Sequence, residues 1–297
     1  MRIVTYQWSG QRYAGRLSND GKEVTPFKFE GKWRERAESH GALALIEMMA
    51  EGSVLPQAGG PALALNSVTL EAPLPRPRRN IFCVGKNYFE HAREFGGSGF
   101  DSSVTKPGDE IPEVPYIFSK VPESVVGPGA AVRIPKGVSE AIDYEAELAV
   151  VIGKGGSRIA KADAMAHVWG YTIINDVTAR DWQQRHKQWH LGKSFDTFCP
   201  MGPCIASVDD CDGRNTQVRI WINEELRQNA STSDLIFDIP TLIECISAGI
   251  TLYPGDIIST GTPVGVGIGF KPPKYLKAGD VMRIEIDGIG VLENPVV

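Results

Sequence analysis

The chain has 297 residues, 42% of them hydrophobic, and a formal net charge of −5 from interspersed acidic and basic residues. Because no long basic stripe is present, nucleic acid is not an expected partner. No apolar run approaches the roughly 20 residues of a membrane span, and the N-terminus lacks a signal-peptide pattern, so we expect a cytoplasmic protein with no membrane partner. The five cysteines are scattered and odd in number, which argues against a disulfide framework.

In chain order, alternating residues predict strands at Met1–Tyr6 and Tyr13–Leu17, and a helical pattern follows at Leu43–Ala50. These elements predict a small α+β domain over residues 1–70. Three prolines within five positions then predict an extended connector over residues 71–79, because proline removes backbone donors and disfavours helix. We place the domain boundary in this connector.

Strand patterns dominate residues 80–297. A β-like run at Asn80–Val84 precedes a helix expected at Asn87–Phe95, and the polar stretch 96–114 is a predicted loop and candidate lid. Further strands are expected at Tyr144–Gly153, Gly170–Asn175, Val218–Ile222, Gly255–Thr260 and Asp280–Ile286, with helices near Ala162–Val168, Ala179–Trp189 and Ile239–Ala248. The sequence therefore predicts a β-rich α+β fold with peripheral helices.

Three carboxylates are candidate metal ligands. In a strand at Asp143–Gly153, Glu145 and Glu147 share one face, about 6.5 Å apart at the backbone. Burying such close like charges is costly without a cation or a proton, so the alternative is a solvated strand face. Asp176 lies at the end of the next expected strand without a structural role. Carboxylates without histidine or cysteine favour Mg²⁺, Mn²⁺ or Ca²⁺ over Zn²⁺.

Other polar residues have competing interpretations. Thr178 and Asp181 have the spacing of a capping box, so we expect them to start a helix. His91 and Glu94 share a helix face, where the carboxylate can orient the imidazole as a general base, although an exposed pair is the alternative. Lys193 follows a glycine and can stabilise an oxyanion, although surface lysines are commoner.

The glycine-rich loop Gly261–Gly269 resembles an anion-binding nest of backbone donors. It carries neither the Gly-Lys-Ser/Thr of a P-loop nor the glycine spacing of a dinucleotide fingerprint. No nucleotide cofactor is therefore expected.

Five motifs in chain order make residues 80–297 resemble the fumarylacetoacetate hydrolase family, particularly its acylpyruvase and oxaloacetate decarboxylase-like branch. They are Val84-Gly-Lys-Asn-Tyr-x-x-His91-x-x-Glu94, Tyr144-Glu145-Ala-Glu147-Leu, Asn175-Asp176-Val-Thr-Ala-Arg180-Asp181, Gly192-Lys193-Ser-Phe-Asp196 and Thr260-Gly-Thr262-Pro-x-Gly-Val-Gly. The resemblance implies a mixed β-sandwich roll as the catalytic domain, usually assembled as a homodimer. It also implies that the metal ligands are Glu145, Glu147 and Asp176.

The resemblance assigns further roles. It implies that Lys193 and the backbone around Gly261 and Thr262 contact substrate, and that the helix carrying His91 and Glu94 orders when substrate binds. Arg180 and Gln183 match positions near the substrate in relatives. Fumarylacetoacetate hydrolases proper carry a further ligand aspartate where this chain has Cys83-Val-Gly-Lys86, so fumarylacetoacetate itself is not the expected substrate.

We therefore expect a divalent-metal-dependent hydrolase that cleaves a carbon–carbon bond in a small 2,4-dioxo acid of the acylpyruvate type, through a metal-stabilised enolate. His91, held by Glu94, would activate water, while Lys193 and backbone donors near Thr262 would stabilise negative charge. An oxaloacetate-type decarboxylase, or a hydratase or isomerase of a related 2-oxo acid, is the alternative. A metal-stabilised binding protein is the non-enzymatic alternative.

Overall fold

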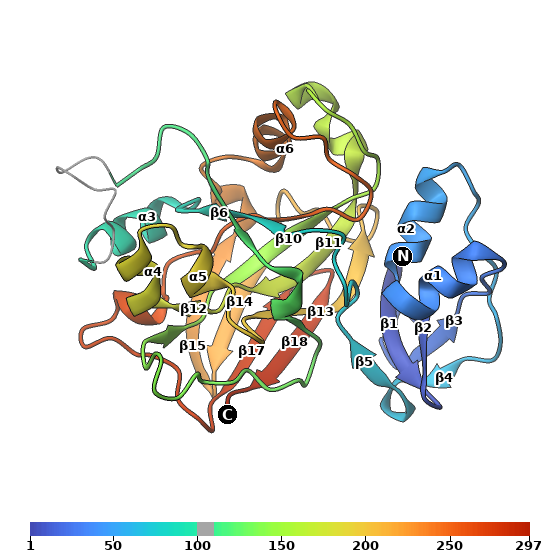
Figure 1. Cartoon of the computed structure of the whole chain (residues 1–297), viewed down its shortest axis with the longest axis horizontal. Coiled ribbons are helices and arrows are strands. Elements are labelled where there is room, and N and C mark those ends of the chain that lie inside the picture. The colour runs from blue at the N-terminus through green and yellow to red at the C-terminus, as the bar shows by residue number, and fades with distance from the viewer. Residues whose placement is uncertain (100–109) are drawn as a thin grey trace.

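A computed structural model describes residues 1–99 and 110–297 as two main β-sheets packed face to face, with helices at the periphery (Figure 1). The predicted α+β, β-rich sandwich fold is confirmed. Residues 100–109 of the candidate lid lie outside the described residues. Within the described ranges, no helix is long and apolar enough to cross a membrane, and all five cysteines are free.

The larger sheet has 12 strands. Its main path runs β4-β3-β2-β1-β13-β11-β10-β16-β6-β7, while β5 pairs with β1 and β8 with β13. The pairings are antiparallel except for β16 with β6 and β13 with β8. Its strands are β1 (Arg2–Trp8), β2 (Gln11–Leu17), β3 (Glu23–Pro26), β4 (Leu63–Ala64), β5 (Thr69–Glu71), β6 (Ile81–Gly85), β7 (Tyr116–Lys120), β8 (Val125–Val126), β10 (Ala146–Ile152), β11 (Val168–Asn175), β13 (Cys199–Ser207) and β16 (Ile257–Ser259).

The smaller sheet covers one face of the larger one. Its order is β15 (Glu225–Ser231), β14 (Gln217–Ile222), β17 (Val281–Ile286) and β18 (Gly290–Pro295), all antiparallel. A separate two-stranded pair joins β9 (Ile142–Asp143) to β12 (Thr178–Ala179). Alternate residues of β14 and β17 are buried in the main core against β10 and β11.

The helices lie outside the sandwich (Figure 1). They are α1 (Lys32–His40), α2 (Leu43–Ala50), α3 (Phe89–Gly96), α4 (Arg180–His186), α5 (His190–Lys193) and α6 (Ile239–Ser247), with 3-10 turns at Leu65–Ser67, Pro122–Ser124, Lys161–His167, Thr232–Asp234 and Gly267–Gly269. The helix expected over Ala179–Trp189 is interrupted at Lys187, whose φ is +58°. The helix expected near Ala162–Val168 is a 3-10 helix.

Two elements escape the sequence pattern for physical reasons. Helix α1 is mostly charged and buries only Ala37, so it has no apolar periodicity to detect. Strand β13 lies in the middle of the larger sheet although it contains Pro200 and Pro203, and proline ordinarily argues against a central strand.

The predicted capping box is wrong. Thr178 lies in β12, and its hydroxyl donates to the Asp176 carbonyl (2.8 Å). Helix α4 has Ala179 at its N-cap and no side-chain cap. Asp181 instead accepts a hydrogen bond from the Ser139 hydroxyl (2.6 Å). Asp181 thus binds a residue distant in sequence and Thr178 pairs in a strand, so neither residue forms the predicted cap.

Strand β10 is buried on both faces, which explains its long apolar run. The predicted alternation is confirmed, since one set of residues packs in the core between the two sheets: Tyr144, Ala146, Leu148, Val150 and Ile152. On the other face, Ala149 and Val151 pack in a second core with Leu45 of α2. Strand β1 also pairs with β13, with Arg2 opposite Ala206. Residues 1–70 thus extend the sheet that carries the predicted ligands.

The Thr5 hydroxyl ties the connector and α2 to β1. It donates to the Pro73 carbonyl (2.7 Å) and accepts from the Ala42 backbone N–H (2.8 Å), and Thr5 is fully buried. Gly41 passes so close that a Cβ there would lie 2.2 Å from the Thr5 hydroxyl oxygen. One buried hydroxyl therefore holds both the connector and the start of α2 against β1.

We expect Thr5→Val to lower the free energy of unfolding by about 2 to 4 kcal/mol, because two buried backbone groups lose their partner. Thr5→Ser keeps the hydroxyl and loses one methyl group, so its expected cost is about 1 kcal/mol. Urea denaturation followed by circular dichroism measures both. Equal losses for the two variants would assign the effect to packing instead of to the hydrogen bonds.

Candidate active site

Three buried carboxylates converge where β10 and β11 lie side by side. Glu147 is in β10, Glu145 directly precedes that strand, and Asp176 directly follows β11. Pairing of Ala146 with Asn175 brings these positions together. One oxygen from each carboxylate lies within 4.8 Å of the others, and no residue of the three is more than 4% exposed. The alternative of a solvated strand face is therefore wrong.

Buried cations neutralise two of the carboxylates. The Lys193 ammonium donates to Glu145 Oε2 and Asp176 Oδ2, at 2.7 Å each. Lys120 donates to Asp176 Oδ1 (2.7 Å), and Arg180 Nη2 lies 2.7 Å from Glu145 Oε1. Burial alone would favour the protonated acid, but Lys193 and Arg180 outweigh it and lower the pKa of Glu145.

Glu147 has no basic side chain at ion-pair distance among the described residues. Its Oε2 instead accepts hydrogen bonds from the Ser259 hydroxyl (2.5 Å) and the Gly261 backbone N–H (3.0 Å). Burial, together with the negative charges of Asp176 and Glu145, raises the pKa of Glu147 well above its ordinary value. A divalent cation fits this deficit of positive charge, and three carboxylates form the hard donor set of Mg²⁺ or Mn²⁺.

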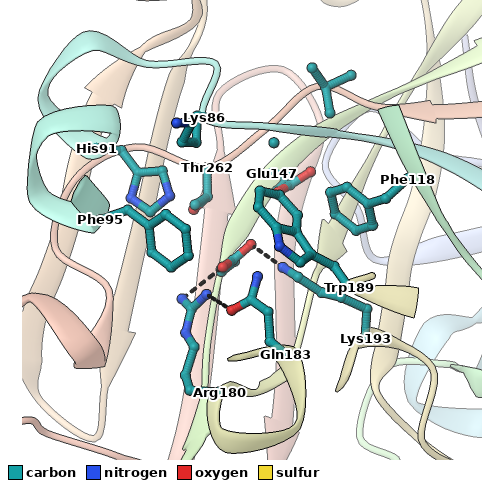
Figure 2. Close-up of a pocket in the computed structure, with 13 residues that line it drawn as sticks. Lys86, His91, Phe95, Phe118, Glu147, Arg180, Gln183, Trp189, Lys193 and Thr262 are labelled. Atoms are coloured by element: carbon teal, nitrogen blue, oxygen red, sulfur yellow. Dashed lines mark hydrogen bonds and ion pairs between the residues drawn. The ribbon is translucent and has the colours of Figure 1, made fainter. Parts of the chain in front are cut away.

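A histidine–glutamate pair lies at the same pocket. On α3, His91 Nδ1 is 3.2 Å from Glu94 Oε2, and the two side chains are 6% and 13% exposed, so the pair is not a surface pair. If Nδ1 carries the proton donated to Glu94, Nε2 keeps its lone pair. Figure 2 shows His91 and Phe95 on one side of the pocket and Lys193 on the other, with Glu147 between them.

Aromatic rings close the pocket. Trp189 makes edge contacts with Phe95 and Phe118, with ring centroids 5.9 and 5.3 Å apart. The indole fits because residue 85 is glycine: a Cβ on Gly85 would lie 2.2 Å from the Trp189 ring. These rings limit the water around the buried charges, and fewer waters strengthen electrostatic interactions inside the pocket.

Helix α4 contributes the two residues that the family resemblance places near the substrate. Arg180 Nε donates to Asp143 Oδ2 (2.8 Å), and its Nη1 donates to Gln183 Oε1 (3.1 Å). Together with the contact to Glu145, these bonds commit the guanidinium to protein groups. The Gln183 amide is thereby oriented, and Figure 2 shows its nitrogen pointing toward the centre of the pocket.

The glycine-rich loop binds carboxylates of the chain itself. Four backbone amides donate to them: Gly261 to Glu147, Gly265 to Glu94, and Gly267 and Ile268 to Asp143. The Thr262 hydroxyl lines the pocket but donates to the Ala146 carbonyl (3.0 Å). The donors expected from the nest pattern are therefore largely used to hold side chains of the candidate site in place.

Sequence reasoning missed Lys120 and Asp143 as parts of the site. Lys120 ends β7, is fully buried, and also donates to the carbonyls of Val177 and Lys193. Asp143 links Arg180 to the glycine-rich loop. Their sequence signals are weak, since one is a lysine at the end of a short strand and the other is one of several neighbouring acids.

Comparisons with known proteins identify similar sequences and structures. The family model described as the fumarylacetoacetate hydrolase C-terminal domain matches residues 80–297. Oxaloacetate tautomerase YisK of Bacillus subtilis is 44% identical, over 100% of both chains. The structure of a fumarylacetoacetate hydrolase from Exiguobacterium antarcticum is 36% identical with a TM-score of 0.82, covering 100% of this chain and 99% of that one.

A third comparison concerns the metal. Maleylpyruvate hydrolase from Sphingobium sp. SYK-6, solved with manganese(II) and pyruvate, is 30% identical with a TM-score of 0.75, covering 100% of this chain and 99% of that chain. A divalent cation bound to a relative of this fold agrees with the donor set formed by the three carboxylates.

Replacing two of the acids by amides is expected to have opposite effects on the metal-free protein. Glu147→Gln removes repulsion and keeps an acceptor, so it should raise the free energy of unfolding by about 1 to 3 kcal/mol. Asp176→Asn leaves Lys120 and Lys193 undercompensated and should lower it by about 3 to 5 kcal/mol. Urea denaturation in the presence of a chelator measures both variants.

Urea denaturation without the chelator tests whether Glu147 binds the ion. Mn²⁺ at about 100 times its dissociation constant should stabilise the wild type by about 2.7 kcal/mol and Glu147→Gln far less. Equal stabilisation of both proteins would exclude Glu147 as a ligand.

Proposed function

The chain belongs to the fumarylacetoacetate hydrolase family, and we propose that it interconverts the enol and keto forms of oxaloacetate or a closely similar 2-oxo diacid. The observation that carries this proposal is the buried His91–Glu94 pair beside the three carboxylates. A full-length relative named as an oxaloacetate tautomerase supports the same reaction. The oxaloacetate alternative thus moves ahead of the carbon–carbon hydrolase expected from sequence.

Tautomerisation moves one proton between the C2 oxygen and C3. In the enol-to-keto direction, the oxygen loses its proton while C3 gains one. His91 is suited to this transfer because Glu94 fixes its ring and leaves Nε2 able to accept and return a proton. The positive charge of Lys193 stabilises the negative charge on the oxygen.

The carboxylates would hold the metal that this chemistry uses. A divalent ion bound by Glu145, Glu147 and Asp176 would act as a Lewis acid on the 2-oxo group and its neighbouring carboxylate. The protein's own groups then set the rest of the environment. The amide of Gln183 supplies a donor, and the rings of Phe95 and Trp189 exclude water that would compete for the proton.

Hydrolysis of a carbon–carbon bond in an acylpyruvate is the second candidate. The same His91–Glu94 pair can deprotonate a water for attack on a distal carbonyl. The similarity to a maleylpyruvate hydrolase solved with pyruvate favours this candidate. The two reactions differ in their products, because tautomerisation releases no fragment.

An activity panel separates the candidates. With Mg²⁺ or Mn²⁺, we expect the purified protein to accelerate the loss of the oxaloacetate enol absorbance without releasing carbon dioxide or pyruvate. Decarboxylation would release both, and acylpyruvates would yield pyruvate only if the hydrolase assignment holds. Pyruvate formation faster than enol loss would reject the tautomerase proposal.

Variants on α3 test the proton carrier. We expect His91→Ala to lower kcat by about 10² to 10⁴-fold, the usual contribution of general acid–base catalysis, and Glu94→Gln to lower it less. Glu90→Gln is the matched control, because Glu90 is on the same helix but exposed and paired with Arg93. A wild-type kcat in His91→Ala would show that His91 does not carry the proton.

A further inference from the structure

We propose that Gly269 is a positioning residue of this site. The space left by its missing side chain seats the Glu94 carboxylate, and Glu94 in turn fixes His91. The inference rests on the proposed function only for the role of His91 in proton transfer. The fit of Glu94 against Gly269 is a property of the structure and can be tested without turnover.

The steric evidence is specific to Glu94. A Cβ built on Gly269 would lie 2.0 Å from Glu94 Oε1, 2.3 Å from its Cδ and 2.5 Å from its Cγ. Real Cβ atoms essentially never approach a neighbour so closely, so the carboxylate would have to move. Gly269 does not have a positive φ, so its backbone conformation is open to other residues. Space for Glu94 is therefore the requirement for glycine here.

A backbone amide fixes the carboxylate within this space. The Gly265 N–H points at both Glu94 oxygens, at 3.1 and 3.2 Å. Oε2 of the same carboxylate faces His91 Nδ1. Position 265 itself requires glycine, because its φ is +106° and a Cβ there would lie 1.9 Å from the Arg227 carbonyl oxygen. The Gly265 amide and the space at Gly269 together define the place of the Glu94 carboxylate.

Apolar packing holds α3 against the same loop. Phe95 of α3 is buried with Val266 and Ile268 in a cluster separate from the two main cores, and Trp189 packs against this cluster. So small a cluster can open locally at less cost than a main core. The docking of α3, and with it the position of His91, is thus sensitive to the fit of Glu94 on the loop.

The loop also has a second anchor that does not involve Glu94. Gly267 and Ile268 donate to the Asp143 carboxylate at 2.6 and 3.0 Å, and Asp143 holds Arg180. These contacts fix the loop on the side of the metal carboxylates. A side chain at position 269 should therefore displace Glu94 and α3 while the loop and the carboxylates stay in place.

Gly269→Ala in the full-length protein tests the proposal. We expect kcat for enol-to-keto conversion to fall about 10²-fold, the effect of a misplaced catalytic group, with a smaller change in KM. Amide hydrogen exchange of α3 should become faster, while exchange in β10 and β11 stays unchanged. Gly249→Ala is the matched control, since Gly249 has no neighbour within 4 Å of an added Cβ and no positive φ. It should retain wild-type values.

A double-mutant cycle separates positioning from general packing. In a Glu94→Ala background no carboxylate remains to be displaced, so adding Gly269→Ala should change α3 exchange and kcat far less than it does in the wild type. Wild-type kcat and α3 exchange in Gly269→Ala would overturn the proposal, and so would equal effects of Gly269→Ala in the two backgrounds. If the wild type does not convert oxaloacetate, the proposed function fails, while exchange still decides whether Gly269 seats Glu94.

Discussion

Burying several carboxylates at one point is the constraint on which the rest of the structure depends. Ionised acids lose hydration when buried and repel one another, so each needs a specific compensating group. Lys120, Lys193 and Arg180 neutralise two of the three clustered acids, while Glu147 has only neutral donors among the described residues. The deficit of positive charge around Glu147 is the feature of the cluster that a divalent cation would compensate.

The glycine-rich loop is the second organising element. Its backbone amides bind carboxylates on both sides of the pocket, at Glu94 and at Asp143. Backbone donors suit this task because they are fixed by the chain and lose no side-chain entropy when they bind an anion. The loop therefore sets His91 and Glu94 relative to the three clustered carboxylates. Its glycines serve close approach here, as the contact of residue 269 with Glu94 illustrates.

One arrangement of this kind suits several reactions. A cation held by carboxylates stabilises an enolate whether the enolate forms by proton loss or by carbon–carbon cleavage. The position and timing of the histidine then decide the outcome, since it can act on carbon or on water. Differences in how firmly α3 is held on the loop would therefore alter the reaction without any change in the metal ligands. Comparison at the level of motifs does not detect such a difference.

The sequence by itself determined the alternation in β10, the shared face of Glu145 and Glu147, and the spacing of His91 and Glu94, because these follow from local periodicity. Asp176 stood out only as an acid at a strand end, and the family motifs joined it to the two glutamates. Only the tertiary structure decided their surroundings. It brought Lys120 to Asp176 and Asp143 to the loop, and it showed that Thr178 caps no helix. These contacts join residues far apart in the chain, and β13 became a central strand despite its prolines. Local propensity carries no information on such partners, which packing and charge compensation select.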